Sequence, residues 1–301
     1  MLDRLPAEIL HIVLDLAATW TAATPENAEV VDRSTLQACS IVCRSVCRVA
    51  QPLLWKHVEL ANEGQADDFE WLMAGPEADE LSRMVRVLSL TGASITFDAM
   101  EHIVEALPLL EELHLSWHRP RGVLPTRVSD GLTHLTLRGF LWPSWIFPAC
   151  PALKHLDMRD THRNAECPTR LVPSLSLPSL ETLLLDLQST DEVSDGFLSA
   201  NTLPSLRRLV LYSMYTEDLP EAFPPIEDQL VAQLELLQLS LGELPCSGTA
   251  RSLLDGFCAA AEQQGVEVVW RAEETESVSM SGLSGFARWA RRKMEAEKGA
   301  E

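Results

Sequence analysis

A six-residue pattern, apolar-x-x-apolar-x-apolar, recurs seven times between residues 85 and 239 and limits the possible folds more than any other feature of the sequence. The first residues of successive copies lie 21 to 28 positions apart. The copies are Val85-Leu88-Leu90, Leu110-Leu113-Leu115, Leu132-Leu135-Leu137, Leu153-Leu156-Met158, Leu180-Leu183-Leu185, Leu206-Leu209-Leu211 and Leu234-Leu237-Leu239. Self-similarity at a period of roughly 20 to 50 residues indicates stacked repeats instead of a single globular core.

Each copy of the pattern predicts a β-strand. Its second and third apolar residues are two positions apart, so they point to the same side of an extended chain. A proline, whose fixed φ suits the entry to a strand, stands two residues before the first leucine of four copies. These prolines are Pro108, Pro151, Pro178 and Pro204. Val266 and Val268 predict a last strand, 29 residues beyond the matching leucines of the seventh copy.

The returns between the strands predict a mixed α/β architecture. One such strand cannot bury its apolar side alone, so we expect a continuous parallel sheet whose inner face is covered by the returning segments. Apolar residues at helical spacing predict helices over residues 97–107 and 249–264. Prolines and short lengths predict irregular connections over residues 141–151 and 219–225.

This pattern and its period resemble leucine-rich repeats. The resemblance implies a solenoid over residues 84–270, in which a parallel sheet is backed by helical or irregular returns. Residues 61–83 are then a linker or a first return, and residues 271–301 a charged C-terminal tail. The end of this tail carries basic residues in a helical pattern, where we expect a solvated helix instead of a partner-binding or import signal.

Residues 1–60 lack the repeat and predict a small helical module. Apolar residues at helical spacing mark a first helix after Pro6, since the missing N–H of a proline costs little in a first helical turn. A polar stretch over residues 17–33 interrupts this pattern. Ser34 is a candidate N-cap for a second helix, which is expected to end before Pro52.

Three motifs of this module, taken together, resemble the F-box. They are Leu5-Pro6-x-Glu8-Ile9-Leu10, Cys39-Ser40-Ile41-Val42-Cys43-Arg44 and Ala50-Gln51-Pro52-Leu53-Leu54-Trp55-Lys56-His57-Val58. The resemblance implies an apolar patch that docks on a Skp-type adaptor and, through it, on a cullin-based ligase. The implied adaptor-binding residues are Leu5, Pro6, Ile9 and Leu10, supported by Ile41, Val42 and Trp55. The alternative for the last three is that they are ordinary core residues.

An F-box followed by leucine-rich repeats resembles the substrate-recognition subunits of SCF-type E3 ubiquitin ligases. Such a subunit performs no bond chemistry and raises the effective concentration of a bound target protein near a conjugating enzyme. The sequence contains no GxSxG elbow, phosphate-binding glycine loop, HExxH motif or dinucleotide fingerprint, so we expect neither an enzyme nor a cofactor. One alternative is a non-catalytic leucine-rich-repeat interaction scaffold without ligase association, and a third option is a hydrolase within the repeats.

The residues between and after the inward leucines of each strand point to the open face of the predicted sheet, where a target would bind. Aromatic and arginine side chains contribute most to interface energies, which favours such residues at the ends of the strands. The predicted target-binding residues are Trp117, Arg138, Asp157, Arg159 and Tyr212. The alternative is that they are ordinary solvated strand residues, with Trp117 under a neighbouring loop.

Two sets of metal-ligand residue types recur at regular spacing. They are His114, His134 and His155 on successive repeats, and Cys39, Cys43 and Cys47 along one helical face. The histidines could stack near one another, but they lack a pattern of partnering carboxylates, so we expect no metal site. Core packing explains the cysteines better than a soft-metal or redox cluster, because zinc motifs combine two separate pairs of ligands.

The charge balance and the cysteines limit the partners and the compartment. With 44 acidic against 24 basic residues, the formal net charge of −20 repels nucleic-acid phosphates and anionic lipid headgroups. Seven cysteines without a CxxC pair favour a reducing compartment, cytoplasmic or nuclear. Asp3, Glu8 and Asp15 interrupt the N-terminal apolar stretch, and the longest uncharged apolar segment contains three prolines, so neither export nor membrane insertion is expected.

Overall fold

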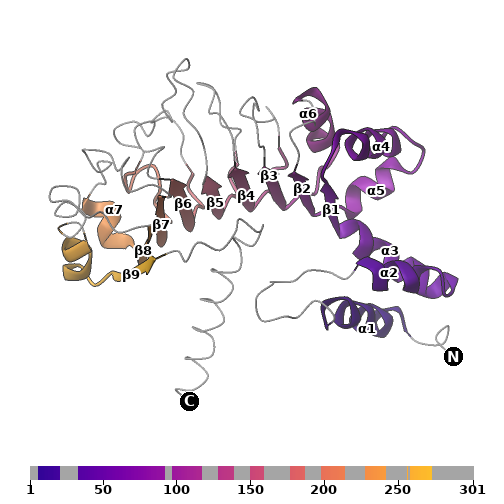
Figure 1. Ribbon diagram of the computed structural model, residues 1–301, viewed down its shortest axis with the longest axis horizontal. Coiled ribbons are helices and arrows are strands. Elements are labelled where there is room, and N and C mark those ends of the chain that lie inside the picture. Colours follow the sequence, from indigo (N-terminus) through magenta and orange to yellow (C-terminus); the bar gives the residue numbers. More distant parts are fainter. Residues whose placement is uncertain are drawn as a thin grey trace. The chain divides into compact units, whose positions relative to one another are not determined.

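The computed structural model divides the chain into two compact units, a helical unit that includes Met1–Lys56 and a sheet unit, His57–Glu274 (Figure 1). The residues it describes are 6–20, 33–91, 97–116, 128–138, 150–158, 177–186, 198–213, 228–241, 256 and 258–272. The boundary precedes the predicted one at residue 60, because His57–Leu60 is already a strand of the sheet.

The helical unit contains α1 (Ala7–Trp20), α2 (Arg33–Ser40) and α3 (Arg44–Lys56). One core cluster joins all three helices, and its buried members are Leu10, Leu14, Leu36, Val46, Ala50 and Leu53. Cys39 and Cys43 pack against this cluster, as the core interpretation predicts for these two, while Cys47 is half-buried. The single helix expected between Ser34 and Pro52 is instead two helices, α2 and α3. The helix α3 continues past Pro52, and Ala50 and Leu53 on either side of the proline are both buried in the cluster.

The sheet unit has an α/β fold with nine parallel strands that pair in the order of the sequence. The strands are β1 (His57–Leu60), β2 (Val87–Thr91), β3 (Glu112–Ser116), β4 (His134–Arg138), β5 (His155–Met158), β6 (Thr182–Asp186), β7 (Arg208–Ser213), β8 (Leu236–Leu241) and β9 (Glu267–Ala272). All seven predicted copies of the pattern contain a strand, which confirms the parallel sheet, and the arrangement is compatible with a solenoid.

Two strands differ from the sequence prediction. The strand β1 was not predicted, although Trp55, Val58 and Leu60 repeat the apolar-x-x-apolar-x-apolar spacing. The strand β9 exists as predicted, but its register is shifted by two residues, because Val268 and not Val266 pairs with Leu237. Val266 instead precedes the strand and is buried there.

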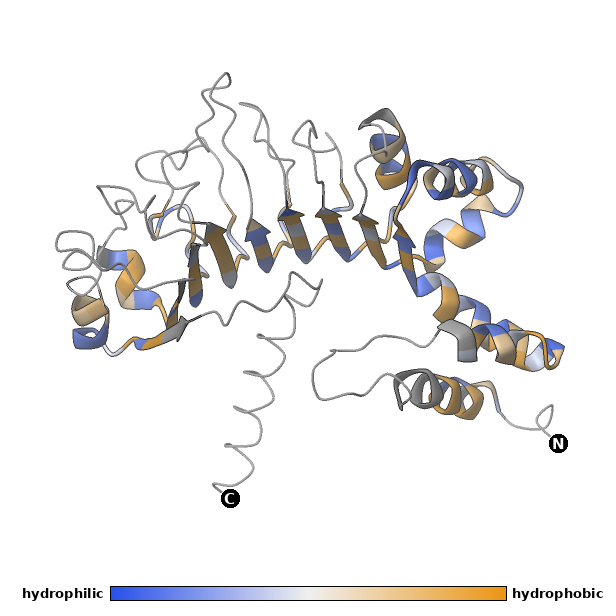
Figure 2. Cartoon of the chain, viewed as in Figure 1, coloured by the Kyte–Doolittle hydropathy of each residue, from blue (hydrophilic) through white to orange (hydrophobic). Residues whose placement is uncertain are grey.

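Leucine side chains of neighbouring strands lie in register on the inner face of the sheet. Leu113 pairs with Leu88 on one side and with Leu135 on the other, and the same alignment continues through Leu156 and Leu183. All of these side chains are buried. Figure 2 shows hydrophobic and hydrophilic residues in alternating colours along several of the strands. The apolar contacts of the core therefore pass from each repeat to the next.

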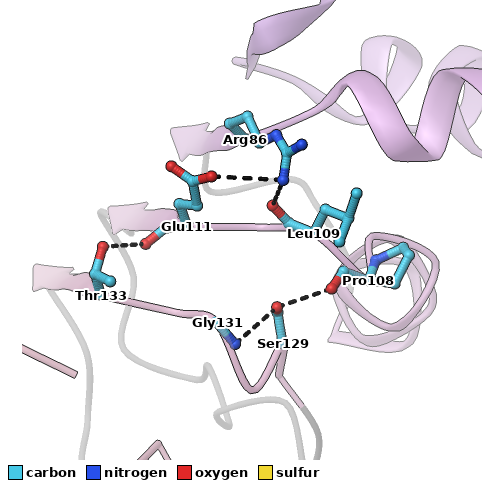
Figure 3. A network of polar contacts seen from close by, with 7 residues as sticks. All are labelled: Arg86, Pro108, Leu109, Glu111, Ser129, Gly131 and Thr133. Carbon is cyan, nitrogen blue, oxygen red and sulfur yellow. Dashed lines mark hydrogen bonds and ion pairs between the residues drawn. The ribbon is translucent and has the colours of Figure 1, made fainter. Parts of the chain in front are cut away.

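The turns that precede the strands are joined by hydrogen bonds between successive repeats (Figure 3). Ser129 Oγ donates to the Pro108 carbonyl at 2.9 Å and accepts from the Gly131 amide at 3.2 Å. Arg86 donates to the Leu109 carbonyl at 3.1 Å and pairs with Glu111 at 3.4 Å. The serine-to-proline bond recurs from Ser179 to Pro151 at 2.7 Å and from Ser205 to Pro178 at 2.6 Å. Three of the four prolines predicted at strand entry, Pro108, Pro151 and Pro178, therefore also accept a hydrogen bond from the following repeat.

In its described part the sheet unit contains α4 (Glu63–Met73), α5 (Ala78–Met84), α6 (Phe97–Glu105) and α7 (Asp228–Gln233). Residues 256 and 258–263 are helical too, within the helix predicted over 249–264. The predicted linker or first return at 61–83 holds α4 and nearly all of α5, and α6 confirms the predicted helix over 97–107. Asn62 caps α4 by accepting from the Gln65 amide at 3.0 Å, while the Gln65 side chain accepts from the Ala61 amide at 2.7 Å. Most of the predicted irregular connections lie outside the described residues. No helix within the described ranges is long and apolar enough to span a bilayer.

We expect Leu183→Ala to lower the free energy of unfolding by about 3 kcal/mol, because it leaves a cavity at a fully buried position between two neighbouring repeats. Leu184→Ala removes a half-buried side chain from the opposite face of the same strand, and its cost should be about 1 kcal/mol or less. Urea denaturation of both variants measures the difference. Equal losses would contradict the assignment of the two faces.

Candidate binding surfaces

The outward face of the sheet, called here the open face, carries the side chains that alternate with the inward leucines. Register aligns them in rows that run across the strands. Described members of the two rows are His57, Val87, Glu112, His134, His155, Thr182, Arg208, Leu236 and Glu267 at the first position, and Glu59, Ser89, His114, Thr136, Asp157, Leu184, Val210, Gln238 and Val269 at the third. Polar residues concentrate on β3, β4 and β5, where the face is half-exposed.

The histidine patch is the cluster formed on these three strands by Glu112, His114, His134, Thr136 and His155. The imidazoles of His134 and His155 stack at a centroid distance of 4.2 Å and an interplanar angle of 18°. His114 Nε2 lies 3.5 Å from a Glu112 oxygen, and its Nδ1 lies 2.9 Å from Thr136 Oγ1. The other Glu112 oxygen is 3.9 Å from His134 Nδ1, too far for a hydrogen bond.

The His134 ring has a further polar contact outside the patch. Thr133 Oγ1 lies 3.1 Å from the Glu111 carbonyl and 2.8 Å from His134 Nδ1. Which atom donates in the second contact depends on the tautomer of His134.

Burial determines the charge of the patch. Desolvation is the largest cause that lowers the pKa of His134, and it lowers the pKa of His155 to about 4, with repulsion from His134 adding to the shift. The hydrogen bond from His114 is the main cause that lowers the pKa of Glu112. Near neutral pH the stacked imidazoles are therefore uncharged, while Glu112 is ionised.

The predicted proximity of the three histidines is found, and the missing carboxylate partner is Glu112. The sequence could have indicated this partner, because Glu112, His134 and His155 each stand directly before the second apolar residue of their copy of the pattern. Residues at the same position of successive copies lie side by side in the sheet. Across the described ranges, no three His, Cys, Asp or Glu side chains are arranged to hold a metal ion. The patch thus offers hydrogen bonds, one carboxylate and aromatic surface to a ligand.

Of the five predicted target-binding residues, the structure describes Arg138, Asp157 and Tyr212. Arg138 and Asp157 make an ion pair at 3.3 Å, next to the histidine patch, and the Nε atom of Arg138 is buried without a hydrogen-bond partner in the described part of the chain. Tyr212 differs from the expectation, since it is only 8% exposed between Asp186 and Ser240 in the register of the sheet. Trp117 and Arg159 lie outside the described residues.

The helical unit exposes large apolar side chains, which we call the exposed apolar set. Its members are Ile9, Ile12 and Val13 on α1, and Ile41 and Val42 in the turn before α3. The three on α1 follow i, i+3, i+4 spacing and share one side of the helix. Ile41 is 85% exposed and Val42 is 60% exposed, so neither is a core residue.

Other predicted adaptor-binding residues take different places. Leu10 is 3% exposed in the core cluster, because with Leu14 it forms the side of α1 that packs on α2 and α3. Pro6 is exposed at the start of α1, and Trp55 is half-buried. Leu5 lies outside the described residues. Ile12 and Val13 were missing from the predicted set, although the helical spacing that marks Leu10 and Leu14 as inward marks them as outward.

Comparison of the chain with known protein-family models and with curated protein sequences gives no match.

Lowering the pH should destabilise the sheet unit through His155. Its pKa is about 4 in the folded chain against about 6.5 in the unfolded chain, so the unfolded chain binds more protons between these values and stability falls as the pH drops through this window. Between pH 7.5 and pH 5 this residue should account for about 2 kcal/mol of unfolding free energy. His155→Phe keeps an aromatic ring beside His134 and should remove that part of the loss in urea denaturation. An unchanged pH dependence would show that the imidazole is not held neutral.

Proposed function

We propose that this protein is a substrate-recognition subunit of an SCF-type E3 ubiquitin ligase. In this proposal the helical unit is an F-box that docks on a Skp-type adaptor, and the sheet unit is a leucine-rich-repeat solenoid whose open face binds a target protein. The observation that carries the proposal is the exposed apolar set, which leaves five large aliphatic side chains in solvent on a unit of three short helices.

The exposed apolar set favours docking because the unit already has a core. Leu10, Leu14 and Leu36 are buried, so the helices do not need Ile12 or Ile41 for their own packing. Grouped aliphatic side chains in water are unfavourable, at about 25 cal/mol for each Å² of apolar surface, and such patches mark interaction sites. The set also includes Ile9, Ile41 and Val42, which the F-box resemblance implies as adaptor contacts.

The open face supports the target-binding half of the proposal. Its rows combine side chains from many successive strands, as in the extended binding surfaces of repeat proteins. Polar, aromatic and charged groups on β3 to β5 are partly exposed and supply directional contacts. Function then consists of holding two proteins in one complex, which raises the concentration of the target near the conjugating enzyme. The five cysteines among the described residues form no disulfide, which fits a ligase of the cytoplasm or nucleus.

Capture by a Skp-type adaptor tests the proposal. We expect Ile41→Asp combined with Val42→Asp to weaken capture by tenfold or more, because two charges would replace exposed apolar side chains at the contact. Ile12→Asp on α1 should weaken it as well. Trp71→Asp is the matched control, since this side chain is apolar and 76% exposed but belongs to α4 of the sheet unit.

The wild-type chain also separates the proposal from its alternative. Purified full-length protein that shows no capture by a Skp-type adaptor, or capture that the helical-unit variants leave unchanged, would reject ligase docking. The chain would then be an interaction scaffold without ligase association.

A further inference from the structure

Acidic side chains lie on β3 to β6 and directly before these strands. Among the described residues, most of those that form an ion pair have an arginine or lysine partner, and one has histidines instead. Glu111 pairs with Arg86 at 3.4 Å, Asp157 with Arg138 at 3.3 Å, and Glu181 with Lys154 at 3.3 Å. Glu112 lies among them, yet no arginine or lysine of the described residues pairs with it. Within the described part of the chain, its ion-pair contacts are to His114 and His134.

The carboxylate of Glu112 therefore retains both charge and acceptor capacity. The stacked histidines are neutral near pH 7, so they do not balance its charge. Glu112 Oε1 lies 3.9 Å from His134 Nδ1, which is too far for a hydrogen bond from the ring to this oxygen. The Glu112 side chain is 36% exposed and can be reached from solvent. A cationic group placed here would complete the charge pairing of the open face.

The stacked imidazoles beside Glu112 favour one kind of cation. His134 and His155 form a double aromatic layer, and the His134 side chain is 34% exposed. A guanidinium group is planar, stacks on aromatic rings and is weakly hydrated, whereas an ammonium group is compact and strongly hydrated. A carboxylate beside a flat ring accepts the two parallel N–H groups of a guanidinium fork.

We propose that the histidine patch binds an arginine side chain of the target protein, with its guanidinium paired to Glu112 and lying against the His134–His155 stack. This inference rests on the proposed function in one respect, that the partner is a target protein of the ligase. It adds that the target presents an arginine. The binding site itself requires no adaptor, so it can be tested on the isolated full-length chain.

The charged and titratable groups around the site determine its response to pH. They are His57 on β1, Glu112 and His114 on β3, His134 and Arg138 on β4, His155 and Asp157 on β5, Arg208 on β7, and Glu111, Lys154 and Glu181 just before the strands. Protonation of His155, whose pKa burial lowers to about 4, adds positive charge beside the guanidinium, so arginine binding should weaken as the pH falls through that value.

A titration of the full-length protein with N-acetyl-arginine amide, followed by NMR of ¹³C-labelled histidine rings at pH 7.5, tests the proposal. We expect saturable shifts of the His134 and His155 ring signals, with N-acetyl-lysine amide binding at least threefold more weakly. N-acetyl-citrulline amide has the shape of arginine without its charge and should give no saturable shift. Equal shifts with citrulline amide, or none with arginine amide, would overturn the proposal on the wild-type protein alone.

Two variants locate the site. Glu112→Gln keeps the side-chain shape but removes the charge, and it should weaken arginine amide binding by tenfold or more. Glu59→Gln changes an exposed carboxylate on β1 of the same face and should leave binding within twofold of wild type. Retained binding in Glu112→Gln would overturn the assignment. Capture by a Skp-type adaptor should be unchanged in both variants, so failure of the arginine site and failure of ligase docking give different results.

Discussion

The stacking of inward leucines in register across neighbouring strands is the interaction on which the sheet unit depends. No single strand of four to six residues can bury an apolar side by itself, so each row of leucines is stable only because the next repeat covers it. The same alternation directs the other side chains of β3, β4 and β5 away from this core, and they are partly exposed. Their chemistry can therefore vary from strand to strand, and on β3 to β5 it becomes polar without cost to the core.

The inner face of the sheet could be predicted from the sequence, because it requires apolar residues at fixed spacing and these recur periodically along the chain. Trp55, Val58 and Leu60 have the same spacing at the strand β1. This segment was assigned to the end of the F-box-like motif, so its repeat spacing was not recognised. The shifted register of β9 has a different cause. Val266 and Val268 are both apolar, and periodicity alone does not show which of them enters the strand.

The candidate sites were less predictable, because exposure depends on contacts between elements. Leu10 and Ile9 are neighbours in one motif, yet α2 and α3 bury the first and leave the second in solvent. Tyr212 occupies an outward position and is nevertheless buried, which its place in the pattern does not reveal. The pairing of Glu112 with histidines follows from strand register, and register became certain only once the pairing of β3 with β4 was known.

The bonds from a turn serine to the proline carbonyl of the preceding repeat have a consequence for how such a chain can change length. Ser179 and Ser205 donate backwards, while Pro151 and Pro178 accept from the repeat that follows. A segment copied from one turn to the next would bring a donor for its predecessor and an acceptor for its successor. In-frame duplication of a whole repeat thus places a serine donor beside a proline carbonyl acceptor at the new boundary. The array can therefore lengthen without further substitutions at that boundary.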